Sequence, residues 1–90
     1  MTTRVERAQG PGFRVPPTVR EGGRLEVDVQ SEATHITLVV PGVGRVKIRV
    51  VDGVAEYRLP PTVHGGAIIF VSDMRLPDPA ATTVLVVGNQ

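Results

Sequence analysis

The sequence predicts an all-β fold, an antiparallel β-sandwich of about seven short strands. Three observations indicate this fold class. Apolar and polar residues alternate with a period of two along most of the chain, turn-forming residues separate the alternating runs, and no run keeps a helical apolar pattern without a Pro or Gly in it. A chain of 90 residues has the length of one small domain.

Four alternating runs predict half-buried strands, each with one aliphatic face. The inward residues are Leu25, Val27 and Val29 in residues 24–30, Ile36, Leu38 and Val40 in residues 34–40, Val46, Ile48 and Val50 in residues 45–51, and Ala55, Tyr57 and Leu59 in residues 54–59. Their neighbours, among them His35, Thr37 and Val39, are expected to point outward. Because aromatic residues make up only 3% of the chain, the core must be aliphatic.

Two pairs of turn residues predict how these runs are connected. Pro41 and Gly42 suit the central positions of a type II turn, because Pro fixes φ at about −65° and Gly accepts the positive φ that follows. Asp52 and Gly53 suit a two-residue type I′ turn, which needs a positive φ at both positions. This second turn predicts that the third and fourth runs pair as a hairpin. Its register sets the inward residues opposite one another: Val50 with Ala55, Ile48 with Tyr57, and Val46 with Leu59.

Two later segments, residues 67–71 and 83–87, are apolar on both faces. This pattern is typical of central strands covered on both sides, or of a surface that meets a partner. We expect one of two sets of side chains to need such a cover: either Ile68, Phe70, Val84 and Val86, or Ala67, Ile69, Val71, Thr83, Leu85 and Val87.

The N-terminal part of the chain is expected to contribute little structure. Residues 1–11 are polar and Gly-rich, and we expect them to be flexible, with residues 12–90 forming a single sandwich domain. Residues 13–15 and 18–19 can form a short leading strand. Pro16 and Pro17 break it and place it at the edge of a sheet.

Four runs carry a recognisable strand pattern: EGGRLEVDV, GRVKIRVVDGVAEYRLPP, LPPTVHGGAIIFVSD and ATTVLVV. An alternating strand that ends in Leu-Pro is followed by a short Gly-containing corner and then the next-to-last strand. Through this pattern the segment from Gly22 to Val87 resembles a bacterial immunoglobulin-like or fibronectin-III-like β-sandwich domain. The chain departs from antibody-type domains because it has no Cys pair, no core Trp and no Tyr at the corner. The resemblance implies an immunoglobulin-like sandwich that serves as a binding, spacer or assembly module.

The composition excludes several kinds of chemistry. Without Cys there is no disulfide, no thiol nucleophile and no Cys-based zinc site. A net charge of +1 provides no global field that would attract nucleic acid or a membrane. No apolar stretch is long enough for a signal peptide or a spanning helix, so we expect a cytoplasmic or virion-associated protein unless it is exported with a larger assembly. Nine of the ten basic residues are Arg, which suggests a GC-rich bacterial or phage genome.

Side chains that could support catalysis or metal binding are sparse. Ser31 and Ser72 could act as nucleophiles beside His35 or His64, with Asp73 as the acid, but no GxSxG elbow accompanies them. We interpret the serines as turn residues and the histidines as solvent-facing. Neither His has a partner ligand at metal-binding spacing. We therefore expect no enzyme activity, no cofactor and no metal site.

Four cations form the first candidate contact surface. Arg45, Lys47, Arg49 and Arg58 point to one side of the predicted hairpin, with Glu56 as the acid that offsets them. They can contact an acidic partner or pair subunits, or they can form a solvated face that discourages edge aggregation. Specific nucleic-acid binding is not expected, because no aromatic side chains are interleaved with these cations on the outward face.

The segment 73–81 is the second candidate contact surface. Met74 and Leu76 are apolar in a segment that should be exposed, and Pro77 and Pro79 stiffen it, which lowers the entropy cost of forming a contact. The same two apolar side chains could instead fold back over the open end of the core. The candidate partner contacts are therefore Arg45, Lys47, Arg49, Arg58, Met74 and Leu76.

These features predict a non-catalytic interaction or structural assembly module that acts through protein–protein contacts and can associate with itself. The two late segments motivate self-association, because their second apolar faces exceed what a small two-layer domain can hide. The alternative is a small-ligand or carbohydrate-binding module that works with a larger enzyme. The shortage of aromatic side chains for stacking disfavours that alternative.

Overall fold

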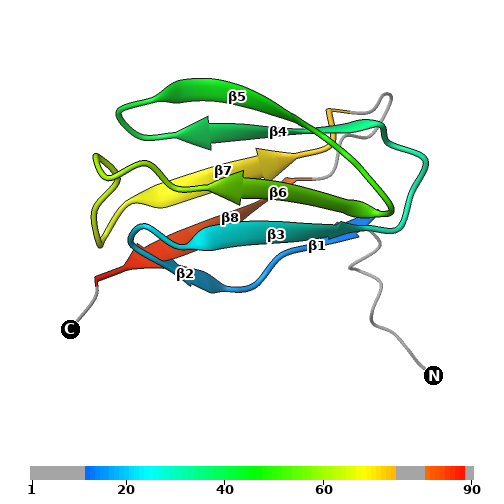
Figure 1. Cartoon of the computed structure of the whole chain (residues 1–90). Helices are drawn as coiled ribbons and strands as arrows, with labels where there is room; N and C mark the ends of the chain where they lie inside the picture. Colours follow the sequence, from blue (N-terminus) through cyan, green and yellow to red (C-terminus); the bar gives the residue numbers. More distant parts are fainter. Residues whose placement is uncertain (1–11, 75–80, 89–90) are drawn as a thin grey trace.

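The computed structural model describes residues 12–74 and 81–88, which fold into two β-sheets packed face to face (Figure 1). The strands in this part of the chain are β1 (Phe13–Arg14), β2 (Thr18–Arg20), β3 (Arg24–Val29), β4 (His35–Val40), β5 (Gly44–Arg49), β6 (Val54–Arg58), β7 (Ile68–Ser72) and β8 (Ala81–Val87). The three-stranded sheet has the order β1-β3-β6, and the five-stranded sheet has the order β2-β8-β7-β4-β5. The described residues contain no helix that could cross a membrane. The prediction of an all-β, two-layer fold is confirmed.

The core lies between the two sheets and is aliphatic except for Phe13, in close agreement with the prediction from the composition. The alternation in β3 and β4 is confirmed, since both strands bury the inward residues expected of them. Thr37 is an exception among the outward residues. It is buried on the outer face, where it lies between Lys47 of β5 and Ser72 of β7. Tyr57 is half-buried, and the buried core consists of Phe13, Val19, Leu25, Val27, Val29, Ile36, Leu38, Val40, Ala55, Leu59, Val63, Ile69, Val71, Val84 and Val86.

The turn between β4 and β5 forms as the sequence predicts. Gly42 has a φ of 81°, and the Val43 N–H donates to the Val40 carbonyl at 2.9 Å, which closes the turn around Pro41. The strands then pair antiparallel along their whole length, from Val40 opposite Gly44 to His35 opposite Arg49. This pairing is local in sequence, so closing its loop costs little conformational entropy.

The second predicted hairpin is wrong beyond its turn. Asp52 and Gly53 do adopt positive φ values of 53° and 79°, and Val51 and Val54 exchange backbone hydrogen bonds of 2.9 and 3.0 Å. After this single bridge the chain leaves the five-stranded sheet, because β5 pairs with β4 whereas β6 pairs with β3 in the opposite sheet. The Asp52-Gly53 turn therefore connects the two layers of the sandwich.

The physical reason lies in what an alternating pattern determines. Alternation assigns each side chain to the core or to the outside. It does not say whether two strands with matching inner faces lie side by side in one sheet or face each other across the core. In this fold Ala55 of β6 pairs with Val27 of β3, and both inner faces still reach the same core.

The leading strand is divided between the two sheets. β1 pairs antiparallel with β3 at one edge of the three-stranded sheet, and β2 pairs parallel with β8 at one edge of the five-stranded sheet. Pro16 and Pro17 lie between them, where the chain changes sheet. The prediction that this region belongs at an edge is confirmed, and the division adds one strand to the expected number.

The register in which β7 pairs with β8 shows which of their two apolar faces points into the core. Ile69 pairs with Val84, and both are fully buried, whereas Ile68 pairs with Leu85, and both are exposed. The two sets predicted from the sequence are therefore both grouped wrongly, because the register shifts β8 by one residue relative to that grouping. The large apolar side chains that these two strands expose are those of Ile68 and Phe70 in β7 and Leu85 in β8.

Candidate functional site

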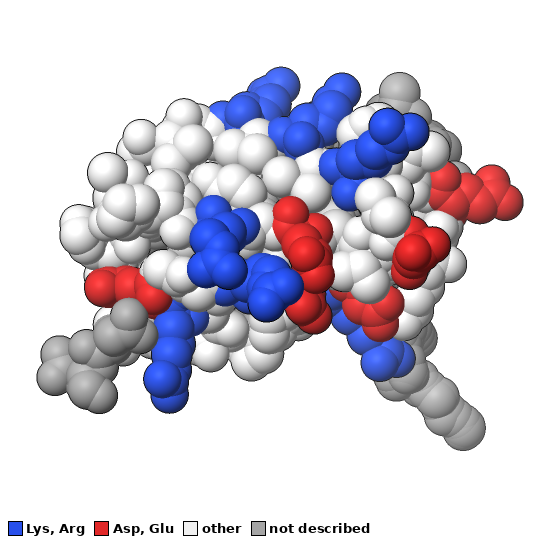
Figure 2. Space-filling model, viewed as in Figure 1, with Lys and Arg blue, Asp and Glu red and all other residues white. Residues whose placement is uncertain are grey.

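The outer faces of the two sheets differ sharply in chemistry. The three-stranded sheet carries charges of both signs on its outer face: Arg14, Arg24, Glu26, Asp28, Glu56 and Arg58. Figure 2 shows these blue and red side chains intermixed over β3 and β6. The ion pair between Arg24 and Glu56, 3.6 Å from nitrogen to oxygen, joins the two strands diagonally. Both of its side chains are half exposed, so it adds little to stability. This surface is typical of a solvated face.

The five-stranded sheet instead exposes apolar side chains. Val39 of β4 lies opposite Phe70 of β7, and Ile68, two residues before Phe70 on the same face, lies opposite Leu85 of β8. Each of the four is between 42% and 55% exposed, and Phe70 is the most exposed of them. We call these four residues the apolar face. They are contiguous across three neighbouring strands, so they form one patch and not scattered surface residues.

A row of cations borders the apolar face. Arg45, Lys47 and Arg49 are exposed on β5, the last strand of the five-stranded sheet, and we call them the basic row. Arg45 lies directly opposite Val39, so the basic row and the apolar face touch at that pair. Figure 2 shows the row as blue side chains along β5 at the top of the view.

Arg58 does not join the basic row, contrary to the prediction. It lies on β6 in the other sheet, directly opposite Arg24 of β3. The prediction placed Arg58 opposite Lys47, which required the β5–β6 hairpin that does not form. The structure thus brings together three of the four predicted cations, and the fourth belongs to the mixed charges of the three-stranded sheet.

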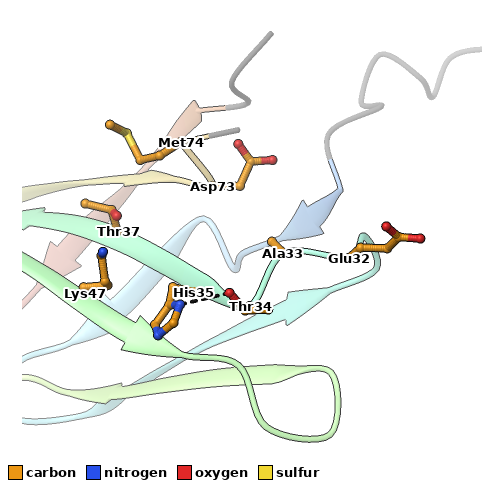
Figure 3. Close-up of a pocket in the computed structure, with 8 residues that line it drawn as sticks. All are labelled: Glu32, Ala33, Thr34, His35, Thr37, Lys47, Asp73 and Met74. Atoms are coloured by element: carbon orange, nitrogen blue, oxygen red, sulfur yellow. Dashed lines mark hydrogen bonds between the residues drawn. The ribbon is translucent and has the colours of Figure 1, made fainter. Parts of the chain in front are cut away.

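A shallow pocket of about 320 Å³ lies where β4 and β5 meet the segment after β7 (Figure 3). It is lined by Glu32, Ala33, Thr34, His35, Thr37, Lys47, Asp73 and Met74. Lys47 of the basic row therefore shares a surface with Met74, the other kind of predicted contact residue. The lining contains His35 but no Phe, Tyr or Trp, the side chains that most often stack on a sugar ring.

Met74 remains on the surface at the rim of this pocket. It is 55% exposed and has a φ of 53°, and its N–H donates to the Ser72 Oγ at 3.0 Å. The alternative that Met74 folds back to cover the core is therefore wrong. Leu76, Pro77 and Pro79 lie outside the described residues.

The polar residues considered for catalysis make local contacts. Ser31 accepts a hydrogen bond from the Ala33 N–H at 3.2 Å, as Ser72 does from Met74, so both serines have the turn role that the sequence predicts. The His35 Nδ1 lies 3.0 Å from the Thr34 Oγ1, next to it in the chain (Figure 3). His64 is exposed in the loop between β6 and β7. In residues 12–74 and 81–88 no three His, Cys, Asp or Glu side chains gather in a way that could hold a metal ion.

Sequence reasoning missed part of the candidate surface. Val39 was in none of the predicted contact sets, although it is an aliphatic residue at an outward position of an alternating strand, which is a usable signal. Ile68 and Phe70 were in one of the two sets expected to need a cover, and Leu85 was in the other. One aromatic side chain lies on the same face of the sheet as the basic row, although it is not interleaved with the cations. Phe70 is exposed on that face, two strands away from β5.

Comparison of the chain with protein-family models, curated proteins and solved structures found no significant match. The function is therefore inferred from the chemistry of the molecule's own surfaces.

Proposed function

We propose that this domain is a non-catalytic protein-interaction module that assembles through the apolar face, with a second copy of the chain as its partner. One observation carries the proposal. Four apolar side chains form a contiguous patch on one sheet, while the outer face of the other sheet carries charges of both signs. Contiguous exposed apolar surface marks interaction sites in soluble domains.

The size of the apolar face sets the expected strength of association. With about half of each side chain exposed, the four residues present roughly 300–400 Å². A stable interface buries about 800 Å² on each partner, so neighbouring polar residues must supply the remainder as a rim. We therefore expect a weak association with a dissociation constant between about 10 and about 500 µM.

The basic row restricts how two copies can pack. A two-fold axis that runs across the strands would stack β5 of one copy on β5 of the other and bring the two basic rows together, which is unfavourable. An axis that runs along the strands places β5 of each copy over β2 and β8 of the other. This second arrangement keeps the cations apart and leaves β7, with Ile68 and Phe70, at the centre of the sheet-to-sheet contact.

Sedimentation equilibrium tests the proposal. Between about 10 and about 500 µM, the wild-type chain should show an average mass that rises with concentration toward that of a dimer. Phe70→Glu should remain monomeric, because a charge at the centre of the patch cannot be buried without a partner. Val51→Glu introduces the same charge at an exposed valine in the β5–β6 turn, outside the apolar face, and this variant should associate like the wild type. A wild-type chain that stays monomeric over this range would overturn self-association.

We further infer that the sandwich belongs to the immunoglobulin-like class. The order of crossings supports this inference. The chain changes sheet at every connection from β1 to β4, and again on both sides of β6, whereas β4–β5 and β7–β8 are hairpins within one sheet. Such Greek-key connections are typical of that class. An experimental structure in which β6 pairs with β5 would contradict this inference.

A further inference from the structure

β5 presents an open backbone edge to solvent. It is the last strand of its sheet, and within the described residues its ladder partner is β4. The Val50 N–H donates to the Thr34 carbonyl at 2.8 Å, so the backbone groups of Val50 point toward β4. Because these directions alternate along an antiparallel ladder, the N–H and C=O groups of Arg45, Lys47 and Arg49 point away from β4. Such an edge can accept another strand.

The two side-chain rows of β5 differ in chemistry. On the outer face the basic row meets His35, Thr37 and Val39 of β4, so no carboxylate lies opposite it in the ladder. The ion pair between Arg24 and Glu56 lies on the other sheet, and the acidic residues Glu32 and Asp73 line the pocket that Lys47 shares. On the inner face the aliphatic side chains of β5 are only half-buried, because they lie at the margin of the core: Val46, Ile48 and Val50.

We propose that the β5 edge binds an extended peptide segment in which acidic and aliphatic side chains alternate. The segment adds to the five-stranded sheet as a further strand next to β5, by backbone pairing with Arg45, Lys47 and Arg49. Its carboxylates then face the basic row, and its aliphatic side chains cover the exposed flanks of Val46 and Ile48. This surface borders the apolar face where Arg45 lies opposite Val39. It binds through the open strand edge of β5 and not through the sheet face, so the proposal goes beyond self-association and does not depend on it.

Charge and backbone chemistry select this occupant over two others. A second copy pairing through its own β5 would set cations opposite cations, which destabilises a strand pair. A nucleic acid could contact the cations, but its phosphates cannot donate hydrogen bonds to the open carbonyls of β5. It would also leave the half-exposed aliphatic row uncovered. An acidic, alternating polypeptide satisfies the donors, the acceptors, the charges and the apolar row together.

The test is a titration of the full chain with a capped synthetic peptide, Glu-Val-Glu-Ile-Glu-Val-Glu, followed by amide chemical shifts in NMR. We expect saturable binding with the largest shifts in β5, weakened several-fold when salt is raised from about 50 to about 500 mM. A control peptide of the same composition, with its four Glu in one block, should bind at least about tenfold more weakly, because its side chains cannot match both rows.

A matched pair of variants separates charge from backbone pairing. Lys47→Ala removes the central charge and keeps the outward N–H. Lys47→Pro removes both and leaves the bonds to β4 in place, because the nitrogen of residue 47 points to solvent. Lys47→Pro should bind about tenfold more weakly than Lys47→Ala. If Lys47→Pro does not fold, as Tyr57 fluorescence would reveal, the wild-type chain is titrated with the same peptide N-methylated at alternate residues. The form methylated at the amides that face β5 should then not bind.

Several outcomes would overturn the proposal. Equal binding by the two Lys47 variants, or by both N-methylated forms of the peptide, would show that backbone pairing is not involved. Tighter binding of a single-stranded oligonucleotide than of the peptide would show that the basic row binds nucleic acid. Phe70→Glu should bind the peptide like the wild type, so failure at this edge and failure of self-association can be told apart.

Discussion

Adjacent residues in β7 have opposite surroundings, because one side chain lies in the core and the next lies on the proposed interface. The Ile69 side chain is fully buried between the sheets, whereas Phe70, the next residue, is 55% exposed on the apolar face. The sequence could not distinguish them, because both faces of this strand are apolar. Only the pairing of Ile69 with Val84 and Val71 with Thr82 places one face inside. A single residue step therefore separates a core position from the centre of the proposed interface.

This contrast predicts unequal effects on stability. Ile69→Ala should lower the free energy of unfolding by about 2–4 kcal/mol, because it leaves a cavity in the core. Phe70→Ser should change it by no more than about 1 kcal/mol when the protein is dilute, because more than half of the residue is exposed and no cavity forms in the core. Urea unfolding followed by the fluorescence of Tyr57, the single Tyr of the chain, measures both values. If Phe70→Ser destabilised the chain as much as Ile69→Ala, the assignment of faces in β7 would be wrong.

At the scale of elements, the sequence predicts strands and faces well and strand partners poorly. The faces of β3 and β4 and the turns at Gly42 and Gly53 follow from local pattern and backbone geometry, so they could be predicted. The partner of β6 could not, because strand pairing over a distance is decided by the packing of the whole core. The candidate site was affected in the same way. Arg45, Lys47 and Arg49 share one strand and stay together, whereas Arg58 depended on a pairing that does not form.

Engineered disulfides test the pairing of β6, and the chain has no Cys of its own to interfere. Val29 and Gly53 are joined by a backbone bond of 2.8 Å, and alternation then makes Glu26 and Glu56 a non-hydrogen-bonded pair with close Cβ atoms. The double variant Glu26→Cys, Glu56→Cys should therefore oxidise to a disulfide, seen as the loss of free thiols. Lys47→Cys with Arg58→Cys should keep both thiols free as a monomer. The reverse result would restore the β5–β6 hairpin.

At the scale of the whole molecule, most strand pairs join distant parts of the chain. Among the described residues, β4–β5 and β7–β8 pair strands that follow one another in the chain. The other pairs do not: β1 pairs with β3, β3 with β6, β4 with β7 and β2 with β8. Each distant pair must close a long loop before its contacts form, and topologies of this kind fold slowly.

We therefore expect refolding in milliseconds to seconds and not in microseconds, despite the small size of the domain. Stopped-flow dilution from urea, with Tyr57 fluorescence as the signal, measures this rate. Phe70→Ser should refold at the wild-type rate, because its side chain takes no part in the core. Refolding within microseconds would mean that local hairpins, and not distant pairing, limit the rate.

The parallel pairing of β2 with β8 also determines how the domain would respond to tension. β1 begins and β8 ends at opposite ends of the sandwich (Figure 1), so a pull on the chain at these two points acts along the strands. After the short β1 peels away from β3, the load passes to β2 and β8, which are pulled in opposite directions. The bonds from the Leu85 N–H to the Pro17 carbonyl and from the Glu21 N–H to the Val87 carbonyl, each 3.0 Å, flank this pair. The force would load these bonds in shear and all together, and would not break them one after another. The domain would therefore resist extension up to a threshold force and then unfold in one step.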